Sequence, residues 1–221
     1  VYSNTVWCAS SDSYVYGLNV RNGKLRHKLK TDKAVVSSPA CADNKVIVAG
    51  GDGICRAWDV NSGELIWQFD SIKNFVVTRP QIKDGIIYFG SWGNEFYALN
   101  IETGKSQWIW NNGHSNRMFS PAQVVPVLTH SRIYLVSPDR FMTVLDEKTG
   151  QVIWRYNDPE NRVRESIGLS EDGNTVYAKT MDGKILARDA TVTERKIKWI
   201  SSGEDMGYEL APTHVVEKNG V

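Results

Sequence analysis

The sequence has 221 residues, of which 41% are hydrophobic and 10% aromatic, so the chain can bury a sizeable core and is not disordered. With 26 basic and 25 acidic side chains its formal net charge is +1, which provides no bulk attraction to nucleic acid or to an anionic membrane. We therefore expect no nucleic-acid partner, and the absence of a run of 18 apolar residues predicts no transmembrane segment.

An aspartate or asparagine recurs along the chain at a nearly constant interval. It stands at Asn19, Asp59, Asn100, Asp146 and Asp189, and successive positions differ by 40, 41, 46 and 43 residues. In the first four units a glycine follows four residues later, at Gly23, Gly63, Gly104 and Gly150. A period in the low forties is typical of propeller blades or helical arrays.

Short β-rich runs favour propeller blades over helices. Runs of this kind cover residues 46–48, 86–89, 133–136 and 175–178, and each is bounded by turn residues. The pairs Asp43-Asn44, Asp84-Gly85 and Asp172-Gly173 predict hairpin turns, because Asn and Gly tolerate positive φ. No segment has the apolar period of a helix. The sequence therefore predicts an all-β fold, a β-propeller of four-stranded antiparallel blades.

The blades divide the chain into repeat units. We interpret residues 1–221 as a single propeller domain, with units at approximately 1–35, 36–76, 77–118, 119–163 and 164–207 and a partial unit at 208–221. Two arrangements are compatible with this pattern. Residues 208–213 could complete the first blade and close a ring of five, or the chain could be an excerpt of a ring of about seven or eight blades, which we favour.

A tryptophan recurs at the start of the fourth strand of each unit. It stands at Trp67, Trp108, Trp154 and Trp199, and His27 takes its place in the first unit. We expect this large apolar side chain to pack against the neighbouring blade. The three cysteines, Cys8, Cys41 and Cys55, form no CxxC motif, so we expect buried free thiols and neither a disulfide framework nor a zinc site.

One repeat resembles a known family. The run that contains Gly90-Ser91, Tyr97-Ala98-Leu99-Asn100, Thr103-Gly104-Lys105 and Trp108 is similar to the repeat of the pyrroloquinoline-quinone (PQQ)-type propellers. That superfamily includes the quinoprotein alcohol dehydrogenases and the lipoprotein of the outer-membrane-barrel assembly machinery. The resemblance covers essentially the whole chain and implies a fold and not an activity.

A second resemblance concerns the middle units. Residues 137–142 and 163–173 are similar to the propeller region found behind a calcineurin-like metallophosphoesterase domain in some bacterial proteins. This chain lacks the His/Asp clusters that such an enzyme needs for two metals. The resemblance therefore implies at most the appended propeller.

Candidate binding residues lie where the repeats differ. In such a blade, the loops between the second and third strands share one face, the loop face, with the crossovers between blades. The candidate ligand-binding residues there are Arg79, Arg117, Arg140, Arg164, Glu165, Trp92 and Asp139. Converging arginines suit a carboxylate or a phosphate. The alternative is that these charges are solvated and paired with neighbouring carboxylates.

The sequence offers no set of catalytic residues. The four histidines have no flanking Gly-x-Ser-x-Gly motif. A quinoprotein dehydrogenase would hold PQQ and calcium, yet this chain has no vicinal cysteines and no matching Glu/Asn/Asp set. We expect no catalytic residue, no metal and no cofactor.

The predicted function is that of a non-catalytic binding or scaffold module, and its attachment to a metallophosphoesterase or another enzyme is left open. Its partner is expected to be a protein or a small anionic ligand. The alternatives are a quinoprotein dehydrogenase-type propeller that binds PQQ and calcium, and an outer-membrane assembly scaffold lipoprotein. The family resemblance alone implies a bacterial protein in the periplasm or otherwise outside the cytoplasm.

Overall fold

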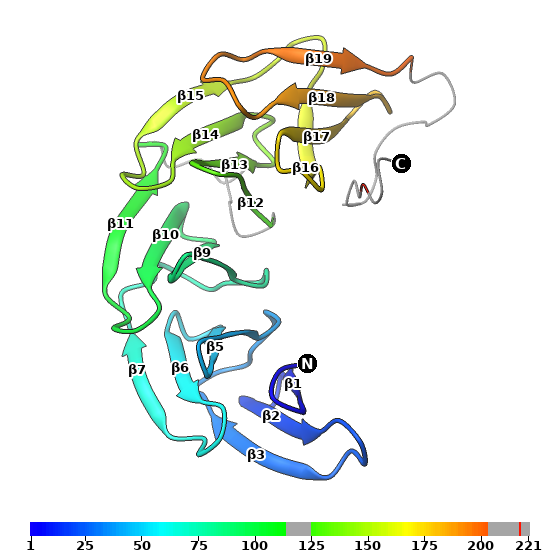
Figure 1. The fold of residues 1–221 in the computed structure, drawn as a ribbon. Helices are drawn as coiled ribbons and strands as arrows, with labels where there is room; N and C mark the ends of the chain where they lie inside the picture. The colour runs from blue at the N-terminus through cyan, green and yellow to red at the C-terminus, as the bar shows by residue number, and fades with distance from the viewer. Residues whose placement is uncertain (114–124, 203–216, 218–221) are drawn as a thin grey trace. The chain divides into compact units, whose positions relative to one another are not determined.

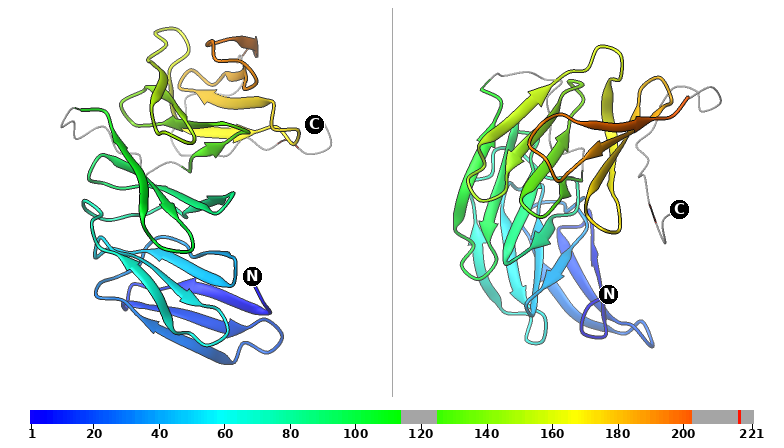
Figure 2. Two further views of the ribbon diagram at one scale, coloured as in Figure 1. Left: turned by 60° about the vertical axis from the view of Figure 1, so that its left-hand side comes forward. Right: turned by 45° about the horizontal axis from the view of Figure 1, so that its top comes forward.

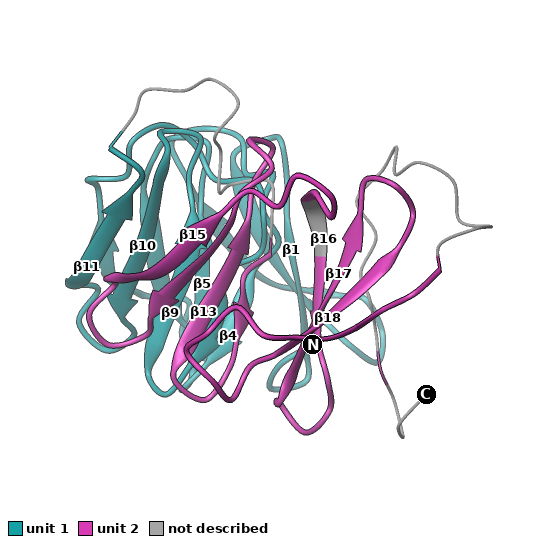
Figure 3. Cartoon of the chain, turned by 90° about the horizontal axis from the view of Figure 1, so that it is seen from above, with its two compact units in different colours: residues 1–114 teal, residues 115–221 magenta. Residues whose placement is uncertain are grey.

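Antiparallel β-sheets make up the fold. The computed structural model describes residues 1–113, 125–202 and 217 (Figure 1). Within these residues the chain forms 19 strands, arranged as one three-stranded and four four-stranded sheets. The described residues include no helix long and apolar enough to cross a membrane. The chain divides into two units, Val1–His114 and Ser115–Val221, which Figure 3 colours separately.

Unit 1 contains three sheets. The first consists of β1 (Thr5–Ala9), β2 (Tyr14–Asn19) and β3 (Leu25–Lys30). The second consists of β4 (Ala40–Ala42), β5 (Lys45–Ala49), β6 (Cys55–Asp59) and β7 (Leu65–Phe69). The third consists of β8 (Gln81–Lys83), β9 (Ile86–Gly90), β10 (Glu95–Asn100) and β11 (Ser106–Asn111). Figures 1 and 2 show these three sheets stacked face to face within the unit.

Unit 2 contains two sheets. The fourth sheet consists of β12 (Val127–Leu128), β13 (Arg132–Val136), β14 (Met142–Asp146) and β15 (Val152–Tyr156). The fifth consists of β16 (Val163–Leu169), β17 (Thr175–Thr180), β18 (Ile185–Asp189) and β19 (Ile197–Ile200). In all five sheets the strands lie in chain order, so each sheet is a simple antiparallel meander.

The recurrent aspartate or asparagine closes the turn after the third strand of each blade. The Asn100 side chain accepts hydrogen bonds from the backbone N–H groups of Glu102 and Thr103, at 3.0 and 2.9 Å. The Gly104 N–H group donates to the Asn100 carbonyl at 2.8 Å, and Gly104 has a φ of +69°. Only glycine adopts this left-handed conformation readily, which explains why the Asn/Asp and Gly positions recur together.

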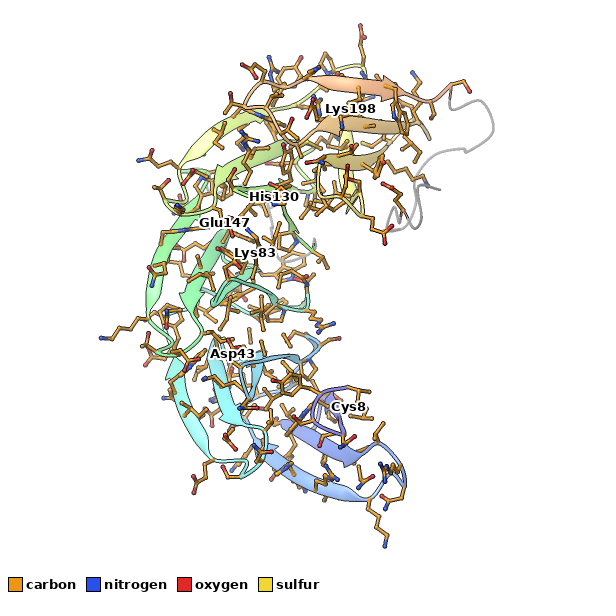
Figure 4. All side chains as sticks on the ribbon, viewed as in Figure 1. Cys8, Asp43, Lys83, His130, Glu147 and Lys198 are labelled. Carbon is orange, nitrogen blue, oxygen red and sulfur yellow. The ribbon has the colours of Figure 1, made fainter. Side chains whose placement is uncertain are left out.

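A second hydrogen bond recurs beside the hairpin between the first and second strands. In the third sheet the Ile101 N–H group donates to the Gly85 carbonyl at 2.9 Å. Equivalent bonds join Val20 to Asn4, Val60 to Asn44, Glu147 to Ser131 and Ala190 to Asn174. Figure 4 labels Asp43 and Lys83 beside two of these hairpins, and His130 and Glu147 beside a third. We call this side of each sheet the hairpin side.

The hydrophobic core of unit 1 lies between successive sheets. Ile47 of β5 and Phe89 of β9 belong to one buried cluster, to which the ring of Trp67 also belongs. The Trp67 Nε1–H group donates to the Ile101 carbonyl of the next sheet at 2.8 Å. The ring also occupies the space in which Gly104 would carry a side chain. The predicted docking role is confirmed for Trp67.

Two expectations about individual side chains need correction. Cys55 is buried, but Cys8 is exposed, because β1 is the edge strand of its sheet in the described chain. Trp199 of β19 occupies the docking register yet is 48% exposed, since all of β19 is solvent-accessible in the described part of the structure.

Candidate functional site

The loop face of unit 1 is built by a backbone contact between each crossover and the loop that follows it. The Gly51 N–H group donates to the Ala34 carbonyl at 3.0 Å, and the Trp92 N–H group donates to the Phe75 carbonyl at 2.9 Å. The backbone therefore fixes these loops, whatever side chains they carry.

Charged side chains complete the first of these loops. The guanidinium of Arg56, which is buried, contacts Asp52 and Asp32, both at 2.6 Å. Asp52 is buried, whereas Asp32 lies on the crossover and is exposed. A buried arginine with two carboxylate partners has its charge satisfied within the protein. This group therefore supports the loop and has little capacity left for a ligand.

The second loop has a different polar network. Lys73 Nζ contacts Glu95 at 2.6 Å, and the Lys73 backbone N–H group donates to the Tyr97 hydroxyl at 2.8 Å. The Tyr97 hydroxyl in turn donates to Glu95. Burial, together with this bond to a carboxylate, raises the pKa of Tyr97 well above its usual value. Tyr97 is therefore a neutral hydrogen-bond donor at any physiological pH.

Two predicted residues of this face, Trp92 and Arg79, are partly or fully exposed. The Trp92 ring is half-buried and lies 5.7 Å from the Phe75 ring, between centroids, with an angle of 30° between the planes. Arg79 is exposed and lines an open hollow of about 510 Å³ together with Pro39, Cys41 and Trp7. Within the described residues, no acceptor contacts its guanidinium.

Asp139 of unit 2 is engaged with a neighbour. Its carboxylate, 5% exposed, accepts a hydrogen bond from the Arg155 guanidinium, which lies 3.8 Å from the centroid of the Phe141 ring. Burial raises the pKa of Asp139, and the bond to Arg155 offsets part of that effect. Asp139 therefore fits the alternative in which the charged loop residues pair with each other and do not bind a ligand, because its carboxylate is bound to Arg155.

Arg140 adopts a backbone conformation that other blades give to small or amide residues. Its φ is +69°, and the equivalent loop positions are Gly53, Gly183, Asn94 and Ser13, which all have positive φ. A long side chain in this region is uncommon and costs conformational energy. Within the described residues its guanidinium has no hydrogen-bond or ion-pair partner. Arg140 remains a candidate for contact with a ligand.

The other candidates cannot be placed by their side chains. Arg117 lies outside the described residues, and β16 contains Arg164 and Glu165, whose side chains are also outside the described part. The proposed convergence of arginines therefore remains a prediction. Among the described residues, no three His, Cys, Asp or Glu side chains form a group that could hold a metal ion. The expectation of no cofactor is untested.

Sequence reasoning missed the partners of these residues. The partners lie on crossovers or outer strands, far along the chain from the residues that they contact. Phe75 is 17 residues from Trp92, Lys73 is 22 residues from Glu95, and Arg155 is 16 residues from Asp139. One signal was available: Asp52 and Arg56 are four residues apart around a tight turn, and a pair of opposite charges at this spacing can meet.

Comparison with known proteins places the chain in a family. A family model described as "Outer membrane protein assembly factor BamB" matches residues 11–123 and again residues 78–197. A relative from Yersinia pestis with the same description is 25% identical over 215 residues, which cover 86% of this chain and 52% of the relative. The chain spans about half the length of the curated relatives that it matches.

Solved structures share the fold. The crystal structure of BamB from Moraxella catarrhalis superposes with a TM-score of 0.70 at 14% identity, covering 90% of this chain and 61% of that one. The computationally designed Ika8 protein superposes with a TM-score of 0.66 at 18% identity, covering 99% of this chain and 76% of that one. The predicted β-propeller fold of four-stranded antiparallel blades is confirmed.

Proposed function

Because the chain belongs to the family of the outer membrane protein assembly factor BamB, we propose that it is a non-catalytic scaffold that binds a protein partner in outer-membrane protein assembly. The observation that carries this proposal is the family match, which extends over both units. Family membership also indicates a location outside the cytoplasm, where the relatives' described role is carried out.

We place the binding surface on the loop face. Its backbone is fixed by the crossover contacts at Gly51 and Trp92, which hold the loops ready for a partner. A surface that is ordered before binding loses less conformational entropy on association. The free guanidinium of Arg79 and the half-buried ring of Trp92 are residue types that often dominate the binding energy of protein interfaces.

The finer readings of function stay predictions. A small anionic ligand would bind at the candidate arginines, and an attached metallophosphoesterase would appear in sequence that flanks this chain. A dehydrogenase would respond to added quinone and calcium with dye-linked alcohol oxidation.

Genetic complementation tests the scaffold function. We expect that removing the protein that carries this chain from its host lowers the amount of folded outer-membrane protein, measured as heat-modifiable bands on gels. Expression of the same protein from a plasmid should restore that amount. Unchanged outer-membrane protein in the deletion strain would refute the proposed function.

A further inference from the structure

One backbone hydrogen bond recurs on the loop face with different side chains around it. Gly51 donates to Ala34 in the second sheet, Trp92 donates to Phe75 in the third, and Met181 donates to Arg162 in the fifth, at 3.0, 2.9 and 2.8 Å. The second sheet shows that the bond forms with two of the smallest residues. The two large aromatic residues of the third sheet are therefore not required by the fold.

The aromatic pair presents apolar area to solvent. Phe75 is 36% exposed, and its ring lies tilted against that of Trp92. Apolar area left exposed to water is unfavourable compared with the same area buried. Aromatic residues on a surface are enriched where proteins meet partners, because they bury much area at a small entropic cost.

The pair is held in place by the polar network described above. The Asn74 side chain accepts a hydrogen bond from the Phe75 N–H group at 3.0 Å, and Asn74 itself has a φ of +67°. Gly93 lies so close to Lys73 that a Cβ atom there would be 2.3 Å from the lysine Cβ. Glu95 neutralises Lys73 at 2.6 Å. The rings therefore sit on a preorganised support.

A positive charge lies on the same crossover. Arg79 follows Phe75 by four residues, which span at most about 14 Å of extended chain. Its guanidinium is unpaired within the described residues, whereas the charge of Lys73 is already compensated by Glu95. The same crossover thus carries an exposed aromatic ring and, four residues later, an exposed guanidinium that suits a carboxylate.

We propose that Phe75 and Trp92 anchor an extended segment of the partner protein, which places a large apolar side chain on the two rings and a carboxylate at Arg79. This inference rests on the proposed function and specifies the partner's chemistry. Exposed Trp and Phe side chains also occur at lipid interfaces. The neighbouring lysine is paired with Glu95, however, and an isolated arginine provides little attraction to an anionic bilayer.

Peptide binding tests the anchor. The probes are short synthetic peptides with Leu and Glu four residues apart, and matched peptides with Ala or Lys at one of these positions. The variant is Phe75→Ala with Trp92→Gly, which copies the residues Ala34 and Gly51 of the second sheet and should therefore fold. The control is Leu65→Ala with Ile66→Ala, which removes exposed apolar side chains from β7.

We expect the wild-type protein and the control to bind the Leu/Glu peptide with similar affinity. The aromatic variant should bind this peptide at least about tenfold more weakly. Arg79→Glu should weaken binding of the Glu peptide and not of its Lys counterpart. Wild-type protein that binds none of the peptides, or an aromatic variant that binds as wild type, would overturn the proposal. So would binding to phosphatidylethanolamine–phosphatidylglycerol vesicles that depends on the rings while peptide binding does not.

Complementation separates this proposal from the function beneath it. If the wild-type protein restores outer-membrane protein and the aromatic variant restores it equally, the anchor is wrong and the scaffold function stands. If the wild-type protein itself restores nothing, the scaffold function fails whatever the peptides show.

Discussion

The hairpin side and the loop face of the sheets are both fixed by backbone hydrogen bonds, yet they treat side chains differently. On the hairpin side, the bond equivalent to that between Ile101 and Gly85 occurs in all five sheets. An Asn or Asp also ends the third strand of all five blades, and a Gly with positive φ follows it four residues later in the first four. On the loop face, a different backbone bond joins each crossover to the next loop, and its donor is Gly51 in one sheet and Trp92 in another. The first side repeats a structure, and the second carries variation on a constant backbone.

The difference teaches where function can reside in a repeat protein. A turn that needs positive φ and a capping carboxylate or amide restricts its residues, because few side chains satisfy both conditions. A loop held by a backbone bond leaves its side chains free to change. Substitutions should therefore act mainly on stability on the hairpin side and mainly on binding on the loop face.

The largest effect is expected from Gly104→Ala. Gly104 has a φ of +69°, and a Cβ atom there would lie 2.5 Å from Trp67 Cε3. We expect a loss of about 2–4 kcal/mol in the free energy of unfolding, from overpacking and the left-handed backbone. Urea denaturation measures this loss. Gly23→Ala is the matched control, because its φ is +67° but nothing lies within 4 Å, so about 1 kcal/mol should be lost. Equal losses would contradict the docking account.

A smaller loss is expected from Trp67→Phe. The change removes the Nε1 hydrogen bond to the Ile101 carbonyl and part of a buried ring, which should lower the free energy of unfolding by about 2 kcal/mol. Trp92→Phe is the comparison on the loop face, where Nε1 has no hydrogen-bond partner in the described residues. It should cost less than about 1 kcal/mol. A larger loss of thermal stability for Trp92→Phe than for Trp67→Phe would contradict the structural role of Trp67.

A small gain is expected from Arg140→Gly on the loop face. Glycine adopts the observed φ of +69° without steric cost, so the free energy of unfolding should increase by up to about 1 kcal/mol. The melting temperature should rise accordingly. Differential scanning calorimetry measures the change. A fall in melting temperature would show that the arginine side chain makes stabilising contacts and is not held there for binding.

Titration of two aspartates should distinguish the two sides without any large change in stability. On the hairpin side, hydrogen bonds from Ser170 and Asn174 lower the pKa of Asp172 from 3.8 to about 2, so its stabilisation is present above pH 3.8 and is lost as the pH falls towards 2. On the loop face, burial raises the pKa of Asp139, so its effect has the opposite sign and favours the folded state at low pH. Carboxyl ¹³C chemical shifts from NMR would report both, and a pKa of Asp139 below that of Asp172 would contradict the comparison.

The sequence by itself determined the repeat, the strands and the turns. Asn100 and Gly104 could be assigned because a capping side chain and a positive φ are local requirements, met within five residues of chain. Alternating β-rich runs between such turns leave few folds other than a stack of antiparallel sheets. The hairpin at Asp84-Gly85 followed in the same way, and both residues have positive φ.

Tertiary structure alone decided which side chains are structural and which are free. Trp67 and Trp92 are the same residue type, but one ring is buried against the next sheet and the other lies on a loop beside Phe75. Arg155 neutralises Asp139 across 16 residues, whereas Arg79 has no such partner among the described residues. These outcomes depend on which strands and crossovers become neighbours, and burial and charge pairing are set by those neighbours rather than by position in the repeat.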